Sequence, residues 1–62
     1  MKRELKQFDA DLIRGTLVDC PDGIRREFLS FDEEGDLMIL APDLNGKSGV
    51  VTFAAEDCDL QS

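Results

Sequence analysis

The chain has 62 residues, of which 42% are hydrophobic and 34% are charged, and it carries a formal net charge of −7. This length supports one small domain, residues 1–62, whose core is too small for a deep enclosed active site, while the apolar content excludes a wholly disordered chain. The acidic balance opposes binding to a phosphate backbone, and no apolar run approaches the roughly 18 residues of a membrane span, so we expect neither nucleic acid nor a membrane as partner.

The first twenty residues predict a short helix followed by a strand. Leu5 and Phe8 are one helical turn apart among helix-forming residues, which predicts one or two turns of helix within residues 1–10. Residues 12–20 are rich in β-forming residues and predict a first strand, in which Gly15 marks a bulge or bend.

The central part of the chain predicts a β-hairpin. Cys20-Pro21-Asp22-Gly23 is a turn, because proline presets the second position and glycine accepts a positive φ. Residues 24–31 form a second strand, whose inward-facing parity changes between Phe28 and Leu29, so we expect it to bend strongly. A turn over residues 32–35 leads to a third strand at 37–41, whose unbroken apolar run predicts that both of its sides are covered.

The last third of the chain predicts two more strands. Asn45-Gly46 is a strong hairpin signal within a loop over residues 42–49. Residues 50–55 then form a fourth strand, Glu56-Asp57 a single helical turn or corner, and residues 58–60 a short closing strand. The fold class is therefore all-β: a small five-stranded SH3-like or Sm-like barrel with an optional short N-terminal helix, closed so that no strand edge is left open.

The residue types in the chain exclude most catalytic chemistry. There is no histidine, which removes His-based nucleophilic catalysis and His-ligated metals, and no pair of carboxylates is marked for burial. We therefore predict that the chain is not an enzyme and has no catalytic residue, cofactor or metal site. Two cysteines cannot supply the four ligands of structural zinc.

Cys20 and Cys58 are the only two cysteines. Cys20 closes the first predicted strand and Cys58 opens the last, and these strands are neighbours in an SH3-like barrel. A disulfide is therefore geometrically conceivable. Nothing in the sequence indicates an oxidising compartment, since no apolar segment follows Met1-Lys2-Arg3 as in a signal peptide, so we expect two reduced, apolar cysteines and a cytoplasmic location.

Acidic residues dominate the second half of the chain. Residues 1–26 carry six basic and five acidic side chains, whereas residues 27–62 carry only Lys47 against nine acidic ones. The run over residues 32–36 is too short for an EF-hand, but it forms a negative tip that fits Arg or Lys on a partner. The predicted partner-binding residues are Asp32, Glu33, Glu34, Asp36, Glu56, Asp57 and Asp59.

Basic residues in the first half form the alternative site. Arg14, Arg25 and Arg26, with Lys2, Arg3 and Lys6 nearby, make an alternative anion-binding cluster, unless they only balance local acids such as Asp11, Asp19 and Glu27. The chain has four phenylalanines and no tryptophan or tyrosine. This composition argues against both a base-stacking platform and an aromatic polyproline groove.

The stretch from Phe28 to Leu40 resembles the first sequence motif of Sm-like proteins. Phe28, Phe31, Asp32 and Leu37 match that motif. The resemblance implies a small barrel. In RNA binding the chain departs from the family, because Asp36 stands where an asparagine reads a base, and the second motif has no counterpart between Gly49 and Leu60. An acidic relative of this family would instead cover the nucleic-acid site of another protein.

The predicted function is a non-enzymatic protein-interaction module that presents an acidic surface to a basic partner, in a regulatory role. Two alternatives stay open. One is an Sm-like or SH3-like nucleic-acid-binding protein that uses the basic cluster. The other is a homo-oligomeric structural building block. The sequence does not identify the partner or the oligomeric state.

Overall fold

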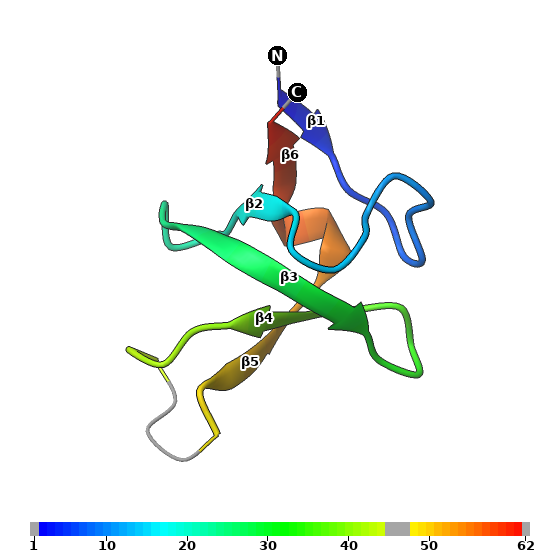
Figure 1. The fold of residues 1–62 in the computed structure, drawn as a ribbon. Helices are drawn as coiled ribbons and strands as arrows, with labels where there is room; N and C mark the ends of the chain where they lie inside the picture. The colour runs from blue at the N-terminus through cyan, green and yellow to red at the C-terminus, as the bar shows by residue number, and fades with distance from the viewer. Residues whose placement is uncertain (1, 45–47, 62) are drawn as a thin grey trace.

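The computed structural model describes residues 2–44 and 48–61 and is a single antiparallel sheet (Figure 1). Within these residues there are strands and one 3-10 turn but no α-helix, so the all-β prediction is confirmed. The elements are β1 (Lys2–Glu4), β2 (Leu17–Asp19), β3 (Arg25–Phe31), β4 (Leu37–Leu40), β5 (Val50–Phe53), η1 (Ala55–Asp57) and β6 (Asp59–Gln61). None of the described residues forms a helix of the length and hydropathy that crossing a membrane requires.

The six strands are ordered β1-β6-β2-β3-β4-β5, and every neighbouring pair is antiparallel. Figure 1 shows the long strand β3 crossing the middle of the twisted sheet, with both chain termini together at one end. β1 and β5 are the two edges, so the predicted five-stranded closed barrel is wrong in both strand number and closure. Closure needs strands that tilt and stagger around an axis, and β1, β2 and β6 have only three residues each.

The predicted N-terminal helix is a strand. β1 pairs with β6 in the register Lys2↔Gln61 to Glu4↔Asp59, and the N–H of Leu5 donates to the carbonyl of Cys58 at 3.2 Å. One or two isolated helical turns are only marginally stable, whereas pairing with β6 satisfies the backbone directly. The chain then leaves the strand through a loop, in which Phe8 has a positive φ of 52° that a helix does not allow.

The central hairpin of β3 and β4 forms as predicted. The register shifts between Phe28↔Ile39 and Ser30↔Met38, so Leu29 is the extra residue of a bulge, and the predicted change of parity at Phe28–Leu29 is confirmed. The prediction that both sides of β4 are covered is wrong, because Ile39 is fully buried whereas 42% of Leu40 is exposed.

The C-terminal elements also follow the sequence patterns. A 3-10 turn over Ala55–Asp57 confirms the predicted corner, and the closing strand β6 pairs with β2 as expected for the first and last predicted strands. β5 ends at Phe53, before the predicted residue 55. β4 and β5 form a hairpin with Leu40 opposite Val50. The predicted Asn45-Gly46 turn lies outside the described residues.

The core lies on one face of the sheet and is small. It contains two buried cysteines and side chains from β2, β3, β4, η1 and the loop after β1, namely Leu5, Leu12, Val18, Cys20, Phe28, Leu37, Ile39, Ala55 and Cys58. Two charged residues, Asp9 and Arg26, are also buried. Each requires a partner of opposite charge, because an unpaired buried charge is strongly destabilising.

Candidate partner-binding site

Aspartates of the first half neutralise several of the basic residues. The Arg3 guanidinium donates to both carboxylate oxygens of Asp9, at 2.9 and 2.8 Å, and to Asp11 at 2.8 Å. Arg25 donates to Asp19 at 3.0 Å. The Arg3 contact holds the pKa of the Asp9 carboxyl well below its usual range, and it fixes the loop that follows β1.

Arg26 is buried and links two loops through its hydrogen bonds. Its guanidinium donates to Asp22 at 2.7 Å, in the β2–β3 turn, and to both carboxylate oxygens of Asp43, after β4, the longer of these two contacts being 2.9 Å. These carboxylates raise the pKa of Arg26, and only 5% of its side chain is exposed. An external anion would have to displace both aspartates, so Arg26 serves the fold.

The structure does not bring the alternative anion-binding residues together as one exposed site. Arg25 and Arg26 are consecutive in β3, so their side chains point to opposite faces, and each is engaged by its own aspartate partners. Arg14 is exposed in the loop before β2. Of the nearby lysines, Lys2 is 3.5 Å from Asp19 and Lys6 lines a pocket described below.

The seven acidic residues that the sequence predicts as a partner surface make none of the ion pairs found within residues 2–44 and 48–61. One of them, Asp32, has a structural task, because its Oδ1 accepts the backbone N–H groups of Glu34 and Asp36, each at 2.9 Å. Glu33 and Glu34 are exposed at the tip of the same turn. The acidic surplus is thus concentrated on the β3–β4 turn and on the segment around η1.

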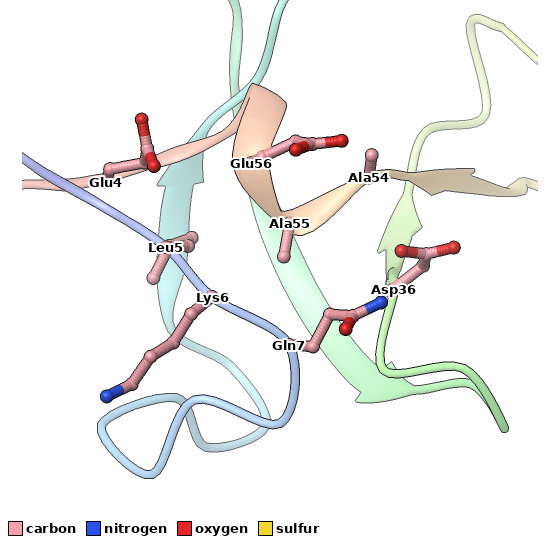
Figure 2. A pocket seen from close by; sticks show the side chains of 8 residues that line it. All are labelled: Glu4, Leu5, Lys6, Gln7, Asp36, Ala54, Ala55 and Glu56. Atoms are coloured by element: carbon pink, nitrogen blue, oxygen red, sulfur yellow. The ribbon is translucent and has the colours of Figure 1, made fainter.

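A pocket of about 310 Å³ joins these two acidic segments (Figure 2). It lies between the end of β1 with its following loop, the residue before β4, and η1. Its lining residues are Glu4, Leu5, Lys6, Gln7, Asp36, Ala54, Ala55 and Glu56. Two predicted partner-binding residues, Asp36 and Glu56, therefore meet at one hollow although they are far apart in the sequence.

Three carboxylates and one half-buried alanine, Ala54, define the chemistry of this pocket. Figure 2 shows Glu4 and Asp36 on opposite sides of the hollow, with Glu56 on η1 between them, while Lys6 extends away from all three. Leu5 and Ala55 lie beneath the hollow as almost completely buried core residues. Within the described residues no group of three acidic or cysteine side chains is arranged to hold a metal ion. The combination suits an organic cation with an aliphatic stem, such as a lysine or arginine side chain.

The sequence pattern did not identify the N-terminal side of this pocket. Glu4 and Gln7 lie in a segment that predicts a helix, and only its pairing with β6 brings them beside η1. The loop is held partly by Phe8, whose ring packs against Phe31 with centroids 5.6 Å apart while 60% of Phe8 stays exposed. No local sequence signal predicts this contact.

The remaining predicted acidic residues lie outside the pocket. Glu33, Glu34 and Asp57 are exposed and do not line it, and Asp59 in β6 faces Asp19 of β2 and Glu4 of β1 across the sheet. The geometry thus singles out Asp36 and Glu56 from the predicted set and adds Glu4. Comparison of the chain with protein-family models, with curated proteins and with solved structures finds no match.

Proposed function

We propose that the chain is a non-enzymatic protein-interaction module that binds a basic side chain of a partner protein in the acidic pocket. The observation that carries this proposal is that three carboxylates from distant parts of the chain, those of Glu4, Asp36 and Glu56, line one hollow. A lysine or arginine would lay its methylene groups against the half-buried Ala54 and place its charge near the carboxylates.

The distribution of ion pairs supports this function. The described ion pairs engage basic residues with aspartates of the first half and with Asp43, and none of them uses the pocket carboxylates. Carboxylates that form no ion pair among the described residues attract a basic surface over a distance set by the ionic strength, which raises the association rate and selects against acidic partners. A nucleic-acid-binding protein is one class of partner with such a surface.

We propose that the chain is an open variant of the small SH3-like and Sm-like domains, and the strand arrangement supports this relationship. β2 and β6 pair, as the first and last strands do in an SH3-like barrel, and the strands β2 to β5 follow one another in the sheet. The additional strand β1 covers the outer edge of β6.

Affinity capture from lysate with the full chain and two charge-matched variants tests the function. In the pocket variant, three lining carboxylates are neutralised as Glu4→Gln, Asp36→Asn and Glu56→Gln. We expect the wild-type chain to capture proteins with basic surfaces. The pocket variant should capture at least about tenfold less of these proteins, because each desolvated charge contact contributes on the order of 1 kcal/mol or more.

The control variant removes the same amount of charge away from the pocket, as Glu33→Gln, Glu34→Gln and Asp57→Asn. These side chains are exposed and do not line the hollow, so the control should retain the captured proteins. Equal loss in both variants would show that only the overall negative field matters. Retention in both would show that the pocket is not the contact.

A further inference from the structure

The two cysteines lie one residue beyond the paired ends of neighbouring strands, Cys20 after β2 and Cys58 before β6. β2 and β6 are antiparallel with Asp19 opposite Asp59, so the next position in this register places Cys20 opposite Cys58. Both side chains belong to the same core cluster and therefore lie on the same face of the sheet, with exposed fractions of 5% and 0%. Both cysteines are free.

The backbone hydrogen bonds show that Cys20 and Cys58 are a non-hydrogen-bonded antiparallel pair. Cys20 donates its N–H to the carbonyl of Ile24 at 3.1 Å and accepts from Gly23 at 2.9 Å, both on the β3 side. Cys58 accepts from Leu5 of the segment after β1 at 3.2 Å and donates to Ala55 at 3.1 Å. Neither cysteine uses its backbone toward the other. In such a non-hydrogen-bonded antiparallel pair the Cα atoms are about 4.5 Å apart, which lies within the range of roughly 4.4–6.8 Å that a disulfide spans.

We propose that Cys20 and Cys58 form a reversible modification site, which a low-molecular-weight disulfide oxidises to an intramolecular disulfide between β2 and β6. The bond would covalently anchor η1, which immediately precedes Cys58, to the end of β2. This inference is independent of the pocket and of its partner.

The reaction balances as two successive thiol–disulfide exchanges. One cysteine loses its proton, and its thiolate attacks a sulfur of the oxidant, whose S–S bond breaks and releases one thiolate that takes up a proton. The second cysteine then loses its proton and attacks the protein sulfur of the mixed disulfide, which expels the second small thiol. The two cysteine sulfurs give up two electrons, and the oxidant is reduced to two thiols.

Burial sets the speed of this reaction. It raises the pKa of Cys58 to about 12 and also raises the pKa of Cys20, and the two thiols are close enough to influence each other's pKa. Because the thiolate is the attacking species, exchange in the folded protein should be slow and should accelerate when β6 opens. The equilibrium constant, rather than the rate, is therefore the quantity to measure.

The test equilibrates the full chain with mixtures of reduced and oxidised glutathione, both in native buffer and in concentrated urea, and counts the species by intact mass after acid quenching. If the folded strands hold the thiols in bonding geometry, the constant for intramolecular disulfide formation should be about 30-fold or more greater in the native protein. Peptide mapping should link Cys20 to Cys58 within one chain. A native constant no greater than the constant in urea, or only mixed disulfides and dimers under native conditions, overturns the proposal.

A register-shifted variant provides the matched control. Cys58→Ala combined with Asp59→Cys keeps two cysteines but moves one by a single position, to the opposite face of β6. This variant should lose the native preference for the intramolecular bond and accumulate mixed disulfides with glutathione. If it matches the wild-type equilibrium, the native register does not direct the pairing.

Discussion

Gly35 shows how one residue sets the shape of the candidate site. It has a φ of 86°, and a Cβ atom there would lie 2.7 Å from Cβ of Gln7 and 2.8 Å from the ring of Phe8. The loop after β1 therefore rests directly on the β3–β4 turn. Because Gln7 and Asp36 both line the pocket, this contact positions two walls of it.

Gly23 makes a matched comparison, since its φ is 83° and no atom outside its own chain neighbours lies within 4 Å of the place that a Cβ would occupy. We expect Gly23→Ala to cost about 1 kcal/mol from backbone strain alone. Gly35→Ala should cost about 2–3 kcal/mol because the loop must also move. Urea unfolding, analysed with one shared m-value, measures the free energy of unfolding of each variant. Equal costs would contradict the packing of Phe8 and Gln7 on Gly35.

At the scale of elements, β6 places one acidic residue between two others. Asp59 is opposite Asp19 of β2 and opposite Glu4 of β1, and like charges directly across a sheet are destabilising. Lys2 and Arg25 already pair with Asp19, so the gain from Asp59→Lys comes mainly from Glu4, and we expect the melting temperature to rise by about 1–5 °C.

The matched control for this change is Asp57→Lys. It alters the net charge equally, but Asp57 lies in the exposed turn η1, outside the sheet. The gain from Asp59→Lys should exceed that of the control at low salt, and the difference should shrink in high salt because screening weakens charge pairs. A melting temperature unchanged by Asp59→Lys would contradict the register of β6.

Most elements could be predicted from local patterns, because their causes are local. The parity change at Phe28–Leu29, the turn before Gly23 and the corner at Ala55–Asp57 each follow from a few neighbouring residues. β1 could not be predicted, because Lys2–Glu4 has no apolar alternation and becomes a strand only by pairing with β6. Whether the sheet closes, and whether Glu4 and Asp36 line the same pocket, depend on contacts between distant segments, which no local pattern contains.

At the scale of the whole molecule, acid stability depends on aspartates held by arginines. The Arg3 contact lowers the pKa of Asp9, Arg25 lowers that of Asp19, and Arg26 lowers those of Asp22 and Asp43. A carboxyl whose pKa is lower in the folded chain than in the unfolded chain stabilises the fold fully above its unfolded pKa, and this stabilisation is lost as pH falls through the folded pKa.

We therefore expect a melting temperature that is nearly constant from about pH 5 to 8 and falls below about pH 4, measured in enough salt to screen the net charge. Asp9→Asn should lower the melting temperature at neutral pH by about 5–15 °C, because Arg3 loses its bidentate partner, and should make the decline below pH 4 shallower. A variant that keeps the full acid dependence would show that Asp9 does not contribute to it.

At the scale of the whole molecule, ion pairs neutralise several basic residues of the first half, while Glu4, Asp36 and Glu56 line the pocket that we propose as the binding site. The most direct test is a titration of the isotopically labelled chain with a short peptide rich in lysine and arginine, followed by backbone amide chemical shifts. We expect saturable shifts concentrated at residues 4–7, Asp36 and residues 54–56, which are lost in the pocket variant and kept in its charge-matched control. Shifts spread evenly over Glu33, Glu34 and Asp57 as well, or no saturable shifts at the pocket, would contradict binding at this site.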